Sequence, residues 1–428
     1  MATAALRPVG TPPSSESNTV VEDKWFRPVA MLAAILAPTY NALFAALNAR
    51  GLPTSRLAAI GAESLILALC IAGCALSGGR NRDAGPLLLM FVAVVVGVAM
   101  SMANDTIYPD FIRNVAIICC FTALGLRVRT EQLILIFRIV SSLILGFLLV
   151  EMISLELYVW LFQPAKYLEA SRGIRQFELN DTGLFANALG FRDRFSFGVF
   201  SGPRTSSLFL EQVSLPGYAT VSLIFLSSKW ENLCISDRIL QIGLILLIVL
   251  SNNSRTSAGL LFVIAAGYFL FPLVTSRLTF LLPVLCLGAA FLIVGPTDKA
   301  FGSDDLVGRL SVTVANLSLL DVKDYLLGSV AVAAHSYDSG YVYVLVSGSM
   351  LGALALWVYV TLVPGAETAA QRRAHWSLAF YVYVWLLIGG TAIFTMKTAG
   401  LLWLLIGHMA AFPKSRPAPA RHLVGNHH

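Results

Sequence analysis

Charged residues are scarce in this 428-residue chain: Asp, Glu, Lys and Arg together make up 13% of it, whereas hydrophobic residues make up 57%. A soluble globular domain carries about 25% charged residues, so the composition excludes an ordinary soluble protein. No basic helix interleaved with aromatic residues is present, which argues against nucleic acid as a partner. The formal net charge of +6 therefore bears on membrane orientation and anionic lipid.

Sequence motifs of several enzyme classes are missing as well. The chain has neither the G-x-x-x-x-G-K-[ST] phosphate loop nor the G-x-S-x-G nucleophile elbow. Its six cysteines and six histidines form no cluster at metal-ligand spacing. The sequence therefore predicts no metal site, no cofactor and no disulfide framework, and the cysteines are interpreted as small apolar residues of a membrane core.

Long apolar runs fill most of the chain. A transmembrane helix needs about 20 consecutive apolar residues, and such runs predict an all-α, polytopic bundle of about 12 spans within residues 29–412. The N-terminal segment has no signal-peptide cleavage site, so residues 1–28 and 413–428 are predicted as disordered cytoplasmic tails. The expected spans are 29–49, 57–77, 86–103, 111–126, 131–153, 206–228, 239–251, 256–275, 278–295, 339–363, 376–394 and 396–412.

The Lys and Arg residues between these runs predict the orientation. Every loop on the N-terminal side carries at least one, which by the positive-inside rule predicts that both termini are cytoplasmic. Two longer loops, about 163–205 and 296–338, then face the outer side of the membrane. Both are basic, against the rule, and the stretch from Leu306 to Leu327 suits amphipathic helices at the membrane surface. Basic loops on the outer side call for an anionic partner.

Two motifs on that side contain an arginine among hydrogen-bond donors. Arg204 follows Pro203 at the predicted start of a helix, whose free N–H groups favour an anion. Arg255 lies in a tight turn beside Asn253 and Ser254, and a guanidinium binds phosphate through two parallel hydrogen bonds. Each arginine is alternatively an interfacial residue that reaches the lipid headgroups. Glu211 is predicted two turns inside the helix that starts after Arg204. A carboxylate there needs a cation as its partner, and Arg204 or Arg255 is the candidate.

The third motif precedes the tenth expected span and contains His335, Tyr337 and Asp338. An imidazole suits general base catalysis near neutral pH, and the alternative is a purely structural histidine. Asp338 is either a partner of that histidine or a cap of the next helix. Gly348 and Gly352 follow at a spacing typical of helix packing in membranes.

Three further charges lie within apolar runs: Glu63, Arg138 and Glu151. Ionisable residues at membrane depth are costly and mark either ion pairs across the bundle or a proton or ion pathway. Structural pairing is the preferred interpretation, with a pathway as the alternative.

Together the three motifs resemble the Wzy-type bacterial polysaccharide polymerases and the related O-antigen ligases. The block from Arg204 to Glu211 is similar to that family's Arg-x-x-Ser-x-Phe-x-Glu block, and the segment 253–256 is similar to its Ser-Arg turn. The stretch from Gly308 to Gly340 resembles the family's last large periplasmic loop, which runs Arg, Leu-Gly, His and then a helix with spaced glycines. The resemblance covers roughly residues 200–360.

The resemblance implies a glycosyltransferase that joins oligosaccharide repeats carried on a polyprenyl diphosphate, as in exopolysaccharide or capsule synthesis. Donor and acceptor are both lipid-linked, and a flippase and a chain-length regulator are the implied protein partners. Arg204 and Arg255 would hold the diphosphate with help from Arg309, and His335 would act as base beside Tyr337 or Asp338. Two alternatives stay open: an O-antigen ligase that transfers glycan to lipid A core, and a transporter or flippase of lipid-linked sugars that depends on Glu63, Arg138 and Glu151.

Overall fold

The computed structural model describes residues 17–79, 81–173, 182–185, 188, 196–200, 202–295, 306–336, 338–388 and 390–411. Every regular element in these ranges is a helix, with no strand among them. Both predicted tails fall largely outside the described residues. The first helix nevertheless begins at Ser17, so residues 17–28 are helical rather than a disordered tail.

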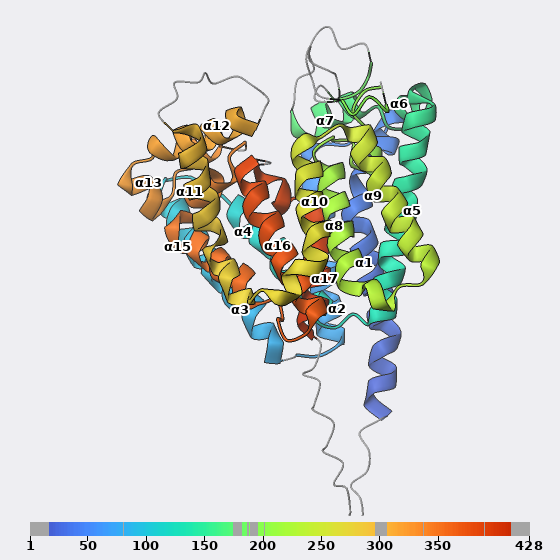
Figure 1. Ribbon diagram of the computed structural model, residues 1–428, viewed down its shortest axis with the longest axis horizontal. Coiled ribbons are helices and arrows are strands. Elements are labelled where there is room, and N and C mark those ends of the chain that lie inside the picture. The colour runs from blue at the N-terminus through green and yellow to red at the C-terminus, as the bar shows by residue number, and fades with distance from the viewer. Residues whose placement is uncertain are drawn as a thin grey trace, which may run out of the picture.

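The long helices run side by side along one axis of the molecule (Figure 1). Twelve of them form this bundle: α1 (Ser17–Ala49), α2 (Arg56–Leu76), α3 (Ala84–Ala103), α4 (Asp110–Gly125), α5 (Thr130–Ile153), α8 (Ser214–Lys229), α9 (Ile235–Asn252), α10 (Arg255–Leu270), α11 (Leu282–Val294), α15 (Gly340–Leu362), α16 (Ala369–Ile388) and α17 (Met396–Ala411). Five shorter helices lie between them: α6 (Leu155–Phe162), α7 (Pro164–Arg172), α12 (Leu306–Ser318), α13 (Val322–Leu327) and α14 (Val330–Ala333).

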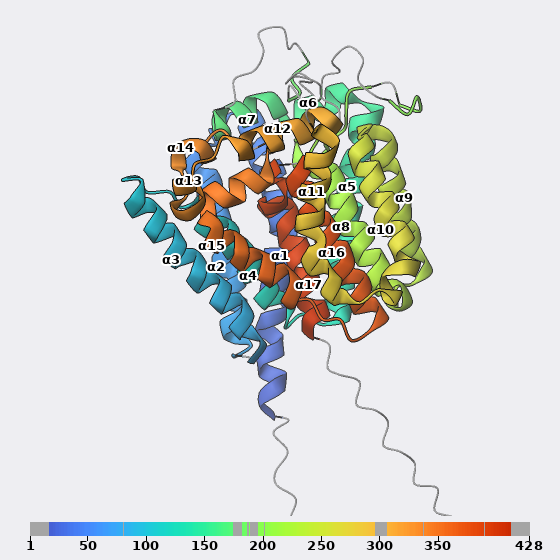
Figure 2. The ribbon, with the colours of Figure 1, turned by 60° about the vertical axis from the view of Figure 1, so that its left-hand side comes forward.

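The bundle has two distinct ends (Figures 1 and 2). The first turns of α1 and the last turns of α17 lie at one end, and α6, α7, α12 and α14 lie at the other, which we call the upper end. Helices α12 and α13 occupy the stretch in which the sequence predicts amphipathic surface helices. The turn between α9 and α10 is also at the upper end, so all three sequence motifs belong there.

The outer faces of the helices are apolar, which identifies a helical membrane protein. Eight helices of the described chain are long and apolar enough to cross a bilayer, and α17 is a shorter apolar helix. Leu57, Phe262 and Leu292 are 78%, 75% and 85% exposed. A soluble protein rarely exposes contiguous apolar surface of this kind, whereas lipid tails solvate it at no cost.

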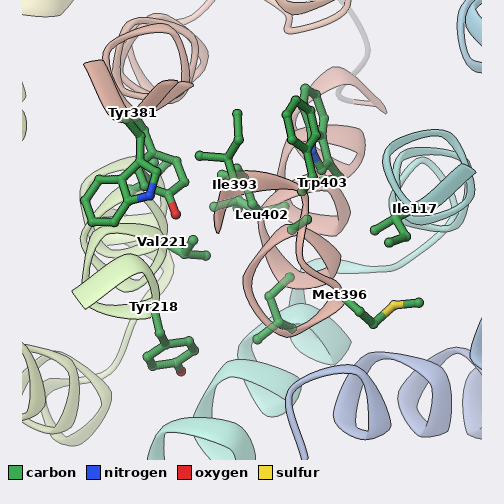
Figure 3. Packing of buried hydrophobic residues seen from close by; sticks show 14 of the residues in the cluster. Ile117, Tyr218, Val221, Tyr381, Ile393, Met396, Leu402 and Trp403 are labelled. Atoms are coloured by element: carbon green, nitrogen blue, oxygen red, sulfur yellow. The ribbon is translucent and has the colours of Figure 1, made fainter. Parts of the chain in front are cut away.

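Helix α17 lies at the centre of the bundle, where residues of α4, α8 and α16 surround it (Figure 3). The helix is buried on all sides, which explains why its sequence is apolar without an amphipathic pattern. Glycines permit the closest approach, to α4: a Cβ at Gly125 would lie 2.1 Å from the Leu404 carbonyl oxygen, and one at Gly407 would lie 2.1 Å from that of Thr122.

The glycine pair of α15 serves packing, as its spacing predicted. Gly348 and Gly352 face the ring of Phe111 on α4, and a Cβ at either position would come within 2.7 Å of that ring. The helix is interrupted beside them at Ser349, whose φ of 54° and ψ of 174° are not helical. This break frees backbone carbonyls of the preceding turn for other partners.

Candidate functional site

The first two sequence motifs meet at the upper end. Arg204 donates from Nε to the backbone oxygen of Asn252 at 2.7 Å and from Nη2 to its Oδ1 at 3.0 Å. The Nδ2 of Asn252 in turn donates to the backbone oxygens of Thr205 and Gln212 at 2.8 and 2.9 Å. One buried amide therefore joins the segment 204–212 to the end of α9, and Arg255 begins α10 three residues later.

Arg255 itself is exposed at the first position of α10. Asn253 makes the turn in the left-handed conformation, with φ of 54°, and its Oδ1 accepts the N–H of Phe197 at 3.0 Å. Ser254 caps α10 by accepting the N–H of Ser257. The side chains of Asn253 and Ser254 thus shape the turn, and Arg255 projects from a capped helix start, where the dipole favours an anion.

The segment around Ser207 differs from the prediction of a helix that starts at residue 206. Ser207–Phe209 is a short 3₁₀ turn, and α8 begins only at Ser214. The N–H groups of Ser206 and Ser207 donate to the carboxylate of Glu151, at 2.9 and 2.6 Å. The carboxylate of Glu151 therefore occupies the position at these N–H groups where the sequence predicts a bound anionic ligand.

Glu211 does not pair with Arg204 or Arg255 as predicted. It lies before α8 and forms ion pairs with Arg172 of α7 and, at 3.1 Å, with Lys397 of α17. Ser214 donates a further hydrogen bond to its Oε2 at 3.2 Å. Burial raises the pKa of Glu211, but the Arg172 and Lys397 cations outweigh burial and lower it to about 2, so this carboxyl is ionised at neutral pH.

Lys397 is the residue that the sequence interpretation missed. It lies at the edge of the expected span 396–412 and is the second residue of α17, where its side chain is only 1% exposed and its Nζ also donates to the Phe209 backbone oxygen at 2.9 Å. The available signal was a single lysine at the edge of an apolar run, which at membrane depth marks a paired or functional charge.

His335 lies at the end of the short helix α14 and is exposed. Its Nδ1 lies 2.9 Å from the backbone oxygen of Ala331. Because a carbonyl oxygen only accepts, Nδ1 must carry the proton, and the other nitrogen, Nε2, is then the proton acceptor in the neutral ring. This is the tautomer that a general base needs.

The loop that carries His335 is held on both sides. The N–H of Ser329 donates to the Val346 oxygen at 2.8 Å, next to the break in α15. Asn104, just after α3, accepts the N–H of Val330 at 3.3 Å through Oδ1. Gly328, the residue before Ser329, has φ of 72°, and a Cβ there would lie 2.6 Å from the Val346 oxygen.

Arg309 and Asp338 complete the third motif. Arg309 donates to the Ile388 oxygen at the end of α16, at 2.8 Å, and Thr313 donates to the neighbouring Leu387 oxygen at 3.3 Å. Asp338 is exposed in the turn before α15, whose N-cap residue, Ser339, donates its hydroxyl to Thr313 instead of capping the helix. The remaining predicted residue, Tyr337, lies outside the described residues.

The predicted site residues thus form two groups at the upper end. Arg204, Asn253, Ser254 and Arg255 lie at α8–α10, and Arg309, His335 and Asp338 lie at α12–α15 (Figure 1). Between them the chain forms η7 (Gly390–Phe394), a 3₁₀ segment that links α16 to α17 and contacts α8 as well as α15. A substrate that reaches both groups would have to cross this segment.

The three charges on which the transporter alternative depends all have polar partners. Glu63 pairs with Arg113 at 2.5 Å, and Arg138 pairs with Asp237 across the bundle at 2.7 Å. The carboxylate of Glu151 is satisfied by serines, as described above. The prediction of structural pairing is therefore confirmed for Glu63 and Arg138, whereas Glu151 is held by hydrogen bonds from serines and pairs with no cation among the described residues.

Comparisons of the chain with protein-family models, with curated proteins and with solved structures found no match. The structure itself defines the class: a helical membrane protein with a polar, charged upper end.

Proposed function

We propose that this protein is a bacterial inner-membrane polysaccharide polymerase, which joins lipid-diphosphate-linked oligosaccharide repeats at the periplasmic face. The twelve bundle helices then all cross the membrane, and the upper end faces the periplasm. The observation that carries the proposal is the pair of hydrogen bonds from Arg204 to Asn252, because they bring Arg204 to the turn from which Arg255 projects.

Two guanidinium groups on one turn suit a diphosphate. A glycosyl diphosphate departs with negative charge on its phosphate oxygens, and fixed cations in a site of low dielectric stabilise that charge without reorganisation. Arg204 is held by two hydrogen bonds, so it is positioned before the substrate arrives. No nucleotide is needed, since cleavage of the sugar–diphosphate bond is itself downhill.

His335 supplies the base in this mechanism. The acceptor hydroxyl oxygen attacks the anomeric carbon of the donor, the bond from that carbon to the diphosphate oxygen breaks, and its electron pair leaves with the diphosphate. The hydroxyl proton passes to Nε2 of His335, the nitrogen left free by the hydrogen bond to Ala331. In this proposal Arg309 and Asp338, which belong to the same group as His335, bind the glycan that extends across η7.

The test uses a strain in which the gene is deleted and wild type, Arg255→Ala, Arg204→Ala or His335→Ala is expressed. We expect the three variants to reach the membrane in wild-type amounts, to make no polymer and to accumulate single repeats on the lipid carrier. Arg277→Ala is a matched control at the opposite end of the bundle, and it should make normal polymer. Normal polymer length in all three variants would refute the proposal, and so would repeats that fail to cross the membrane.

A further inference from the structure

Five charged side chains from five segments converge near the upper ends of α1, α2 and α4. We call them the outer charge cluster: Glu63, Arg113, Arg172, Glu211 and Lys397. Two hydrogen-bonded groups make up the cluster, Glu63 with Arg113 and Glu211 with Arg172 and Lys397. Helix α1 connects them, since the Tyr40 hydroxyl donates to Glu63 at 2.5 Å and the adjacent Asn41 accepts a hydrogen bond from Tyr167 of α7, the helix that carries Arg172.

Glu63 places one side of the cluster at membrane depth. Glu63 is seven residues inside α2, about 10 Å below the helix end at 1.5 Å per residue, and α2 is a candidate membrane span. Charges at such depth are costly, and apolar residues of the same volume often give equal stability. A fold that only needed packing here would not require three cations.

Both arginines of the cluster remain open to a ligand although they are paired. The side chains of Arg113 and Arg172 are each 39% exposed, whereas those of Glu63 and Glu211 are each 12% exposed. Within the described chain, Arg172 uses only Nη1 for its carboxylate, so the other nitrogens of its guanidinium keep free N–H donors. The two arginines therefore present donors outward, and the carboxylates lie behind them.

Two polar atoms without partners among the described residues lie on and beside α7, the helix that carries Arg172. Among the described residues, the Oγ of Ser171 and the Nδ2 of Asn41 have no hydrogen-bond partner, although both side chains are only 4% exposed. Asn41 is tied to α7, because Tyr167 donates its hydroxyl to Asn41 Oδ1 at 2.6 Å. A buried polar atom without a partner destabilises the fold, and both of these atoms can donate to an anion.

The charge balance favours a phosphate at the Arg172 side. The group of Glu211, Arg172 and Lys397 carries two cations and one carboxylate. Asp110, half-buried in the first turn of α4, offsets the charge of Arg113 instead. Neighbouring apolar side chains are exposed on α2, among them Ile60 and Leu65, and they suit the acyl or prenyl chain of the same ligand.

We infer that the outer charge cluster binds the phosphate head of a lipid, with Arg172 and Arg113 as its ligands. On the proposed function, this lipid is the carrier of the second glycan, because polymerisation needs two lipid-linked substrates and the turn at Arg204 and Arg255 holds one. The same chemistry would recognise the headgroup of an anionic phospholipid, and the experiment separates these two sources.

Binding is measured on the purified full-length protein in phosphatidylcholine nanodiscs, with geranylgeranyl diphosphate as the probe and native mass spectrometry as the readout. We expect two bound probes in wild type, one in Arg172→Ala and two in Arg138→Ala. Arg138 is the matched control, an arginine paired with a carboxylate elsewhere in the bundle. Arg172→Ala is expected to fold, because Glu211 keeps Lys397 and Ser214 as partners.

Retention of two bound probes by Arg172→Ala would overturn the inference. Arg204→Ala is measured in parallel: loss of a probe there but not in Arg172→Ala would leave the proposed function standing and remove only the inference. Loss of a probe in Arg172→Ala but not in Arg204→Ala would support the lipid site at the outer charge cluster and remove the diphosphate site at Arg204. Nanodiscs that contain phosphatidylglycerol decide the source, since a site for bulk lipid would lose the probe in them and a site for the carrier would keep it.

Discussion

The guanidinium of Arg204 donates to both oxygen atoms of Asn252, one on the backbone and one on the side chain. This single contact joins segments 48 residues apart. The contact holds Arg204 close to the turn that leads to Arg255. It depends on the side-chain amide of Asn252, which is only 1% exposed. Asn252 is therefore the residue through which the two motifs can be separated experimentally.

Replacement of Asn252 should impair polymer synthesis although the residue need not touch the substrate. In Asn252→Ala two buried backbone oxygens lose their donor, at a cost of about 1–3 kcal/mol each, and Arg204 loses one of its two acceptors. We expect a lower thermal midpoint and at least tenfold less polymer. Asn252→Asp keeps the acceptor for Arg204 and should retain more activity than the alanine variant. Asn232→Ala, at an exposed site, is the control; equal activity in Asn252→Ala and this control would contradict the prediction.

His335→Asn separates the structural from the chemical role of the imidazole. The asparagine amide can still donate to the Ala331 oxygen, so the loop should keep its position. It has no basic nitrogen, and loss of a general base costs about 10²–10⁴-fold in rate. We expect normal expression and a turnover reduced by that factor, measured with purified lipid-linked repeats. Wild-type turnover in this variant would show that His335 only shapes the loop.

Gly328→Ala should disturb the same loop from its other end. The added Cβ would meet the Val346 oxygen at 2.6 Å, and the residue has a positive φ that side chains disfavour. We expect a loss of about 1–3 kcal/mol in stability together with reduced polymer. Gly243→Ala on α9 is the control, because nothing lies within 4 Å of its Cβ position and φ is ordinary. Gly243→Ala should be at least as stable as wild type. A Gly328→Ala protein with the stability of wild type would refute the prediction.

Glu211 should make the protein sensitive to acid. Its pKa in the folded state, about 2, lies below the ordinary value of 4.5. The carboxylate therefore contributes its full stability above the ordinary value and loses it progressively as the pH falls toward the folded value. In Glu211→Gln the thermal midpoint should be lower at pH 7, and the difference from wild type should shrink between pH 4.5 and 2. A difference that stays constant across this range would contradict the assignment of the ion pairs.

Hydropathy predicted the regular helices well, because a helix that crosses the lipid needs a continuous apolar run of about 20 residues. The expected spans 57–77, 131–153 and 339–363 correspond to α2, α5 and α15 within one residue at each end. It failed at residues 206–213, which are apolar enough to resemble a helix. Their N–H groups bind Glu151, 55 residues earlier in the sequence, and no local pattern reveals such a partner.

The partners of charged residues were the least predictable part of the site. Glu211 binds Lys397, which is 186 residues away, and Arg172, whose loop was treated as surface. Arg138 shows the opposite case, because a charge inside a strongly apolar helix has to find a carboxylate. The sequence thus indicates which charges need partners, whereas only the packing of helices determines which partners they find.

The central position of α17 has a consequence for biogenesis. A ribosome delivers α17 after every other described helix, yet α1, α4, α8 and α16 all pack against it. The earlier helices must therefore wait in the bilayer around a place that is still unfilled, or separate again when α17 arrives with Lys397 at its leading edge. Completion of the bundle and burial of the Lys397–Glu211 ion pair are then one event, so a nascent chain held back before α17 has neither its core nor the full charge arrangement beside Glu211.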